Sequence, residues 1–329
     1  WRGLELPAWK EFSSINAGLV RERISKPPSQ AVAHSIPDWL EELGLSELGS
    51  RWPGIVVRMN ESAPVYLRAN ALKCTADDLQ KLLRIANIET VKLSEVELSS
   101  IENSHPRFDL PAALQLKVRS NVFSTDAFRL GLFEVQDAAS QLIAPFLQVA
   151  PGMRVIDACA GAGGKTLHLA ALMHNKGKII ALDVSEKRLE QLAIRSRRAG
   201  VNLLEIRMIE SSKTIKRLAQ AADRVLLDAP CTGLGVLRRN PDAKWRLNRN
   251  TLDELIVTQQ QILADYAKMV KPGGKLVYAT CSILPSENER QVEKFLATNP
   301  GWTLDEELKI LPDTSEFDGF YAARLSLKS

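Results

Sequence analysis

The chain has 329 residues, of which 45% are hydrophobic and 25% are charged, a composition typical of a globular protein with two domains. No run of about 18 apolar residues is present and the N-terminus carries no signal pattern, which excludes a membrane-spanning helix and predicts a cytoplasmic protein. The formal net charge of +4 is compatible with a polyanionic partner without identifying one. Because the chain begins with Trp1 and not with Met, a fragment or a processed form is expected.

The four cysteines exclude several kinds of site. They are Cys74, Cys159, Cys231 and Cys281, with no CxxC spacing, and only four histidines accompany them. This pattern argues against a structural zinc site, so we expect no bound metal. A disulfide scaffold is not expected either, because a chain of this length can build a large core. Taken singly, each cysteine is most simply a small buried apolar residue.

The first part of the chain predicts two short units. Residues 1–50 have a helical pattern interrupted by prolines, with a helix start at Pro37. Residues 51–120 mix strands and helices and predict a small α+β domain. Its candidate elements are a strand over 65–68, a helix over 76–85 capped by Thr75, and a strand over 113–118.

Residues 121–150 are a predicted connector that ends in a short apolar helix. From there, over residues 151–329, strand and helix patterns alternate. The strand candidates are residues 153–158, 178–183, 203–208, 223–228 and 274–280. Such alternation predicts an α/β fold, in which helices cover both faces of a parallel sheet. After Pro285 we expect a helix and then two strands, near 302–311 and 318–325, that form an antiparallel edge.

The stretch VIDACAGAGGKT, residues 155–166, runs from a buried strand through a glycine-rich turn into a helix. Glycines let the backbone approach a ligand, and a helix N-terminus offers free N–H groups. A P-loop needs glycine at Cys159 and a dinucleotide turn needs it at Thr166, so the first pattern fails and the second is partial. S-adenosylmethionine is the remaining ligand, with Asp157 at its amino-acid end and Asp183 at its ribose. The competing interpretation is a turn that merely packs the helix on the strand.

Two cysteines follow strand candidates, Cys231 in the segment DAPCTG and Cys281 in YATCS. In an open α/β sheet both lie at the carboxyl edge, where ligands bind. The chemistry suits methylation at carbon 5 of cytosine, because a thiolate that adds to carbon 6 makes carbon 5 nucleophilic. Asp228 is placed to favour this addition at the ring nitrogen, and a second cysteine can assist release. Lys165 is a candidate for a cation that favours the thiolate, or for a phosphate contact.

Several segments resemble the RsmB/NOP family of RNA cytosine-C5 methyltransferases, also called the NSUN type. They are YLRANALK, EVQDAASQL, DACAGAGGKT, LDVSEKRL, DAPCTGLGVLRRNPDAKW, KPGGKLVYATCS and DGFYAARL. The resemblance extends over about residues 35–329, and it is specific because PCTG and TCS occur together in this order. Within the family, the RsmB-type enzymes of 16S ribosomal RNA are the most similar, with transfer RNA enzymes as the alternative. Residues 12–17 also resemble the tail of a NusB-like domain, of which no complete copy is present.

The resemblance implies a class I S-adenosylmethionine-dependent methyltransferase fold, with a Rossmann-like sheet, preceded by a small α+β RNA-binding domain. It implies that Cys281 is the nucleophile, that Cys231 assists product release and that Asp228 serves the target base. The residues that it assigns to S-adenosylmethionine are Cys159, Ala160, Gly161, Ala162, Gly163, Gly164, Lys165, Asp183, Arg188 and Asp228. Two departures stand out. Gly161-Ala162 replaces a frequent Ala-Pro, and Glu210 stands where an Asp commonly contacts adenine.

RNA contacts are expected from the loop after Cys231 and from the small domain. Basic side chains can pair with phosphates, and an aromatic ring can stack on a base. The candidates are Arg68, Asn70, Arg238, Arg239, Lys244 and Trp245. Ordinary packing, capping and surface roles are the competing interpretation of each.

Three other functions fit parts of the sequence. In a DNA cytosine methyltransferase the cysteine of the Pro-Cys pair attacks, which would make Cys231 the nucleophile. A non-catalytic RNA-binding assembly factor can keep the fold, but the complete set of Asp228, Cys231 and Cys281 argues against it. A NAD-dependent oxidoreductase fits poorly, because Thr166 takes the place of the third glycine. Ribosomal RNA as partner and S-adenosylmethionine as cofactor are therefore the expected pair.

Overall fold

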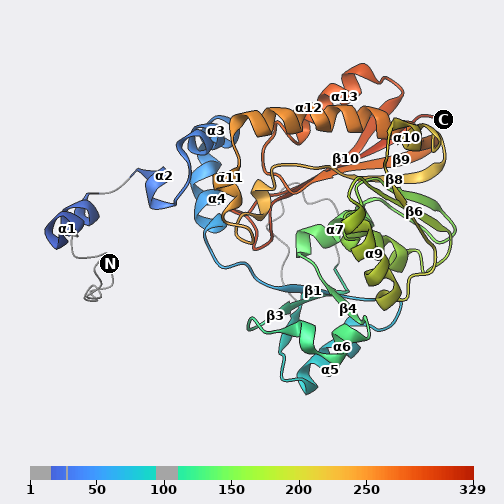
Figure 1. Cartoon of the computed structure of the whole chain (residues 1–329), viewed down its shortest axis with the longest axis horizontal. Coiled ribbons are helices and arrows are strands. Elements are labelled where there is room, and N and C mark those ends of the chain that lie inside the picture. Colours follow the sequence, from blue (N-terminus) through green and yellow to red (C-terminus); the bar gives the residue numbers. More distant parts are fainter. Residues whose placement is uncertain (1–15, 27–28, 94–109) are drawn as a thin grey trace.

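The computed structural model describes residues 16–26, 29–93 and 110–329, and its largest element is a seven-stranded mixed sheet (Figure 1). The strand order is β10-β11-β9-β8-β5-β6-β7. The strands are β5 (Arg154–Asp157), β6 (Lys178–Asp183), β7 (Leu204–Met208), β8 (Ala222–Asp228), β9 (Val270–Thr280), β10 (Trp302–Ile310) and β11 (Phe320–Leu327). Neighbours from β7 to β9 are parallel, whereas β11 is antiparallel to both β9 and β10. The predicted parallel sheet with an antiparallel edge is confirmed.

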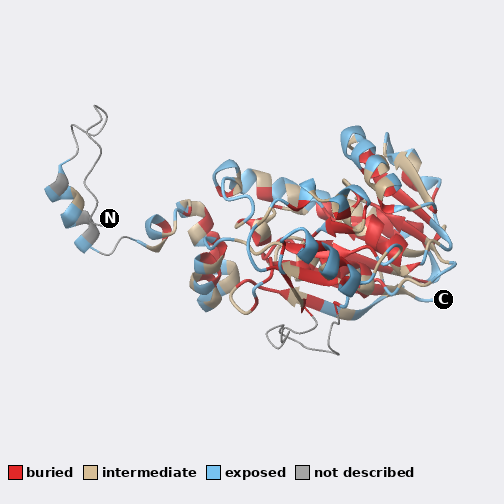
Figure 2. Ribbon diagram, turned by 90° about the horizontal axis from the view of Figure 1, so that it is seen from below, coloured by how far each residue is buried: buried red, intermediate tan, exposed pale blue. Residues whose placement is uncertain are grey.

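Helices cover both faces of this sheet, because successive strand residues point to opposite sides. Val155 of β5 packs in the core of one face and Ile156 in the core of the other, and Ile179 and Ile180 of β6 divide in the same way. The helices of one face are α7 (Ala138–Phe146), α8 (Gly164–Leu172) and α9 (Glu186–Ala199), and those of the other are α10 (Ser212–Lys216), α12 (Arg249–Tyr266) and α13 (Glu289–Thr298). Figure 2 shows the buried sheet between helices with exposed outer faces.

A second, four-stranded antiparallel sheet forms the small domain, with strand order β2-β3-β1-β4. Its elements are β1 (Tyr66–Ala69), α5 (Ala76–Ile85), β2 (Thr90–Lys92), β3 (Ala113–Leu116), α6 (Asp126–Arg129) and β4 (Phe133–Val135). Thr75 caps α5, as the sequence predicted, and Asp78 completes a capping box that the prediction did not include. The sequence missed β4, whose residues lie in the predicted connector 121–150. The predicted boundary at residue 120 therefore cuts through this sheet.

The N-terminal helices are α1 (Ala17–Ser25), α2 (Gln30–Ala33), α3 (Asp38–Leu48) and α4 (Trp52–Met59), and α3 begins directly after Pro37 as predicted. Of these, α3 and α4 pack on the large sheet domain, whereas α1 lies apart from both domains (Figure 1). Trp52 of α4 shares a hydrophobic core with Leu237 and Ile283, which follow Cys231 and Cys281 in the chain. The packing of this helix therefore helps to hold the two cysteine loops in place. Residues 1–15 and 27–28 of the predicted helical segment 1–50 lie outside the described residues. Of the helices that the structure describes, none has the length and apolarity needed to cross a bilayer.

Candidate active site

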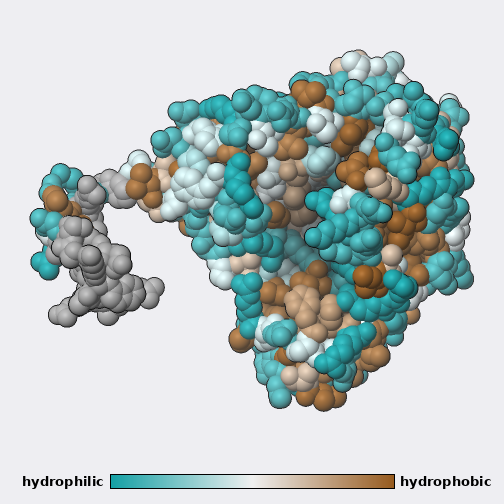
Figure 3. Space-filling model, viewed as in Figure 1, coloured by the Kyte–Doolittle hydropathy of each residue, from teal (hydrophilic) through white to brown (hydrophobic). Residues whose placement is uncertain are grey.

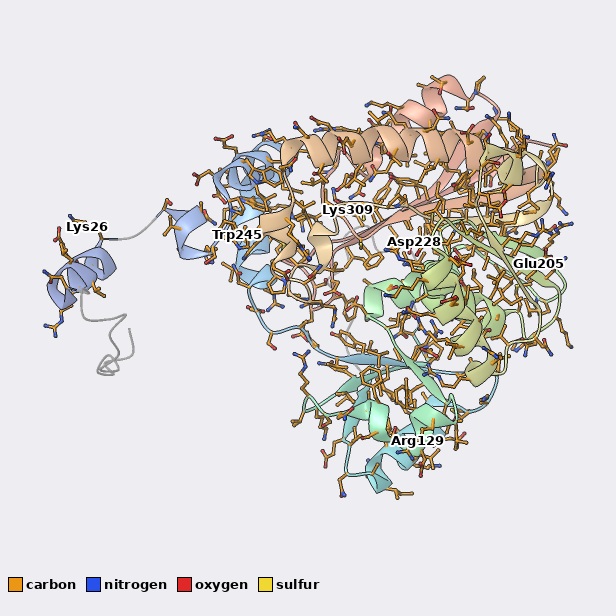
Figure 4. All side chains as sticks on the ribbon, in the orientation of Figure 1. Lys26, Arg129, Glu205, Asp228, Trp245 and Lys309 are labelled. Carbon is orange, nitrogen blue, oxygen red and sulfur yellow. The ribbon has the colours of Figure 1, made fainter. Side chains whose placement is uncertain are left out.

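Four strand ends meet at the carboxyl edge of the parallel sheet. Asp157 ends β5, Asp183 ends β6, Asp228 ends β8, and Cys281 directly follows β9. The strand order reverses direction at β5, and ligands of open α/β sheets bind at such a point. A cavity of about 560 Å³ opens there, and these four residues and Cys231 are among those that line it. Figure 4 labels Asp228 at this edge, and Figure 3 shows the surface hollowed between the large and small domains.

The glycine-rich turn joins β5 to α8 in a conformation that other residues resist. Gly161 and Gly163 have φ angles of 54° and 88°. A Cβ on Gly163 would lie 2.1 Å from the side chain of Leu192, so close packing also requires glycine there. Asp183 accepts hydrogen bonds from the backbone N–H groups of Gly161 and Ser185, both at 2.8 Å. The Asp183 carboxylate therefore holds the turn as well as bordering the cavity.

The charges and apolar walls of the cavity fit S-adenosylmethionine. Asp157 is buried; one carboxylate oxygen accepts from Thr166 at 2.6 Å, and the other has no partner among the described residues. An ammonium group would satisfy this orphaned acceptor, as the amino-acid end of the ligand provides. Burial raises the pKa of Asp157 to about 7 against the opposing hydrogen bond from Thr166. Val184 and Ile209 form apolar walls of the cavity. Glu210, which stands where the family commonly has an adenine-contacting Asp, is exposed and does not line the cavity, and Ile209 before it borders the cavity instead.

Most of the residues that the sequence assigned to the cofactor line this cavity. They are Cys159, Ala160, Gly161, Ala162, Gly164, Lys165, Asp183, Arg188 and Asp228. Gly163 shapes the turn instead. Burial, and to a smaller extent the neighbouring carboxylates, raise the pKa of Cys159 well above its ordinary value. Cys159 is therefore a neutral thiol in the cavity wall. Within the described residues, no cluster of His, Cys, Asp or Glu side chains could hold a metal ion.

Lys165 and Asp228 form an ion pair at the cavity. The Lys165 Nζ atom lies 2.7 Å from Asp228 Oδ2, and the two side chains are 11% and 30% exposed. Burial lowers the pKa of Lys165, whereas the Asp228 carboxylate and, to a smaller extent, a negative charge on Cys281 raise it, and the net shift is upward. Lys165 therefore stays a cation beside both Asp228 and Cys281. Because Lys165 contacts the Oδ2 atom of Asp228, the Oδ1 atom remains available for a hydrogen bond with a ligand.

The structure brings the two predicted cysteines together. Their Sγ atoms lie 3.4 Å apart. The backbone N–H of Gly235 donates to the Cys281 carbonyl at 2.9 Å, and a Cβ on Gly235 would lie 2.8 Å from this oxygen, so the loops meet at a glycine. The hydrogen bond to Cys281, then burial, then the charge of Cys281 and finally the Glu287 carboxylate raise the pKa of Cys231 well above its ordinary value. Cys231 is thus a neutral thiol whose S–H can donate to the Cys281 Sγ atom.

Glu287 belongs to this site, although sequence reasoning missed it. Its fully buried carboxylate accepts from the Thr232 N–H at 2.8 Å, the Thr232 hydroxyl at 2.6 Å, the Gln259 amide at 3.0 Å and the Ser282 hydroxyl. Thr232 and Ser282 each directly follow one of the two cysteines. A hydroxyl residue after both cysteines was the available signal, because buried hydroxyl groups require an acceptor.

Two of the predicted RNA contacts are buried between the domains and need correction. Arg68 of β1 donates to the Gly164 carbonyl in the glycine-rich turn at 2.8 Å, and its side chain is buried. Asn70 is also buried and donates to the Ala199 carbonyl at the end of α9, again at 2.8 Å. Both side chains join the small domain to the large one, so they are not presented to RNA.

The basic loop after Cys231 is partly internal as well. The Arg238 side chain is 3% exposed and donates to Asp318 at 2.7 Å, and Arg239 contacts the same carboxylate but is 31% exposed. Lys244 on α11 (Ala243–Arg246) is buried, whereas Trp245 beside it is 60% exposed. Arg238 and Lys244 are therefore structural residues. Asp318 lies 80 positions after Arg238, and the loop pattern gave no sign of this partner.

Comparison with known proteins gives matches over both domains. Residues 144–326 match the family model described as 16S rRNA methyltransferase RsmB/F, and residues 36–99 match the RsmF/B-like ferredoxin-like domain. A probable ribosomal RNA small subunit methyltransferase B from Synechocystis sp. is 34% identical over 89% of this chain and 67% of its own length. Ribosomal RNA small subunit methyltransferase B from Vibrio vulnificus is 35% identical over 88% and 66%. The chain spans about two thirds of the length of these curated relatives.

Solved structures show the same fold. A methyltransferase homolog protein from Pyrococcus horikoshii has a TM-score of 0.76 at 27% identity, over 92% of this chain and all of the other. NSun6 from the same organism, solved with SFG, has a TM-score of 0.74 at 22% identity, over 89% of this chain and 98% of its own. The predicted methyltransferase fold with its Rossmann-like sheet and small preceding domain is confirmed.

Proposed function

The chain belongs to the 16S rRNA methyltransferase RsmB/F family of S-adenosylmethionine-dependent enzymes, and we propose that it methylates carbon 5 of a cytosine in RNA through a covalent cysteine adduct. The observation that carries this proposal is the pair of thiols, 3.4 Å apart, at the cavity that Asp228 borders. One thiol suffices for addition to a base, whereas a second one beside it suits an adduct that must be resolved. Small-subunit ribosomal RNA in the cytoplasm is the proposed substrate, as the names of both relatives suggest.

Addition is the first step that the residues support. The Cys281 thiolate, with the Lys165 ammonium nearby, forms a bond to carbon 6; the electron pair of the 5,6 double bond shifts to the bond between carbons 4 and 5, and the pair of the 3,4 double bond moves onto ring nitrogen 3. For this step Asp228 carries a proton, which it gives to ring nitrogen 3 of an extruded base as that atom takes up the displaced electrons, and Lys165 then pairs with the carboxylate that is left. When bound, S-adenosylmethionine supplies an electrophilic methyl group to carbon 5.

Release reverses the addition. The proton on carbon 5 passes to solvent, its electron pair restores the double bond, and the bond between carbon 6 and Cys281 Sγ breaks. Cys231 donates its S–H to Cys281 Sγ and so stabilises the departing thiolate. A neutral donor is needed here, and the raised pKa of Cys231 keeps it protonated.

A methyl-transfer assay tests the proposed function. The protein is incubated with methyl-labelled S-adenosylmethionine and, separately, with small-subunit ribosomal RNA and transfer RNA, and bisulfite sequencing maps each product. We expect label at carbon 5 of a cytosine in ribosomal RNA. Label confined to transfer RNA would mean that transfer RNA, and not ribosomal RNA, is the substrate. Absence of label from every RNA, with cofactor binding intact, would favour a non-catalytic assembly factor.

A further inference from the structure

Two cysteines in adjoining loops are chemically alike, so something in the protein must decide which one attacks. The described residues around them differ in charge. Lys165 is the cation whose pKa the Cys281 thiolate raises, whereas the carboxylate of Glu287 acts on Cys231. Glu287 lies outside the residues that line the cofactor cavity, and the mechanism above does not use it.

Hydrogen bonds from Glu287 reach both cysteine loops. We call Glu287, Gln259, Thr232 and Ser282 the Glu287 clamp. On the Cys231 side, Gln259 donates to the Pro230 carbonyl at 2.9 Å as well as to Glu287. On the Cys281 side, the Ser282 hydroxyl donates to Glu287. The carboxylate is therefore the shared acceptor that joins residues 55 and 5 positions away from it in the chain.

The negative charge of the Glu287 carboxylate disfavours ionisation of the nearby Cys231 thiol. Glu287 is fully buried and has four hydrogen-bond donors, so its charge is compensated by dipoles and not neutralised by a neighbouring cation among the described residues. A buried negative charge disfavours a second one nearby. The Cys231 thiolate is thereby disfavoured, after the larger effects of the Cys281 hydrogen bond, burial and the charge of Cys281, which also raise the pKa of Cys231.

We propose that Glu287 is a positioning residue for both cysteines: its carboxylate fixes the separation of the two thiols and places a buried negative charge at the Cys231 loop, so that Cys281 attacks and Cys231 assists release. The inference rests on the proposed function for the roles of attack and release. Its electrostatic half does not depend on those roles, because it concerns only the buried Glu287 carboxylate and the Cys231 loop to which Thr232 ties it.

Alkylation of Cys231 tests the electrostatic half without RNA. In a Cys281→Ala background, the rate of iodoacetamide labelling of Cys231 is followed against pH by mass spectrometry of its peptide. Glu287→Gln should shift the midpoint to lower pH by about 1 unit or more. Glu293→Gln is the matched control, because Glu293 is exposed on the neighbouring helix α13. A Glu287→Gln midpoint equal to that of the control would overturn the assignment.

Adduct release tests the geometric half. Ser282→Ala removes one tie to Glu287 and keeps the charge, so the Cys231 midpoint should stay unchanged while radiolabelled RNA adduct accumulates about tenfold, as expected for one lost charge-assisted hydrogen bond. Adduct at the wild-type level would overturn the positioning role, and this variant decides the matter if Glu287→Gln fails to fold. Failure of the proposed function looks different, because then Cys231→Ala also forms no adduct.

Discussion

The carboxyl group of Asp157 makes cofactor binding sensitive to pH near neutrality. Burial raises its pKa to about 7, so below this pH the group is protonated and above it the group is a carboxylate. An ammonium ligand binds the carboxylate in preference, and affinity for S-adenosylmethionine should rise between about pH 6 and pH 8. Titration calorimetry at several pH values across this range measures the affinity for S-adenosylmethionine. Asp157→Asn should bind more weakly and lose this part of the pH dependence; a wild-type affinity as flat as that of the variant would contradict the role.

Single residues were predictable where chemistry and strand position coincide. Asp228, Cys231 and Cys281 follow strands that the apolar pattern marks, so their meeting at one edge could be expected. Glu287 could not, because its Thr232 partner is 55 positions away and no local pattern links them. The same limit explains Arg238: a basic residue in a loop predicts an exposed side chain until its distant acidic partner is known.

Between elements, the small domain supports the cofactor turn. Glu134 of β4 is 6% exposed and pairs with Arg195 at 2.8 Å and Arg198 at 2.5 Å, both on α9. Arg195 in turn donates to the Ala162 carbonyl at 2.7 Å. Together with the contact from Arg68, two small-domain strands therefore reach carbonyl groups of the glycine-rich turn.

Breaking this link should affect stability and cofactor binding together. Glu134→Ala leaves Arg195 and Arg198 without their shared acceptor, which costs about 3 kcal/mol, the lower end for a buried pair because both arginines are partly exposed. Urea unfolding and calorimetry with S-adenosylmethionine provide the two measurements. Glu89→Ala, which removes an exposed partner of Lys117, is the control and should leave both unchanged. Normal cofactor affinity in a destabilised Glu134→Ala protein would argue against support of the turn.

Elements were predictable in proportion to their length and burial. Strands buried on both faces, such as β6 and β9, are apolar runs between turn residues, and α5 carries a capping box. β4 has three residues and pairs with a strand far away in the chain, so its local sequence carries no period that could mark it. Its position decides where the small domain ends.

For the whole molecule, the exposed basic and aromatic surface near α11 is where we expect RNA to bind. Trp245, which is labelled in Figure 4, is 60% exposed, and the Arg246 side chain is 66% exposed. Trp245→Ala should weaken RNA binding by about 1–3 kcal/mol through loss of stacking, measured by filter binding. Arg246→Gln should reduce the slope of log affinity against log salt by about 0.7–0.9.

Lys268→Gln is the matched control for that charge. Lys268 is 67% exposed and pairs with an acidic residue of its own helical turn, as Arg246 does. Equal salt slopes for the two variants would mean that net charge, and not the α11 surface, attracts RNA.

Trapping of the covalent adduct tests the central claim most directly. Radiolabelled RNA is incubated with S-adenosylmethionine and with wild-type, Cys231→Ala or Cys281→Ala protein, and a denaturing gel separates free RNA from protein-bound RNA. The thiols 3.4 Å apart predict a persistent protein–RNA band for Cys231→Ala and none for Cys281→Ala. A band lost in Cys231→Ala and kept in Cys281→Ala would make Cys231 the nucleophile, as in the DNA-type reaction, and would contradict the account.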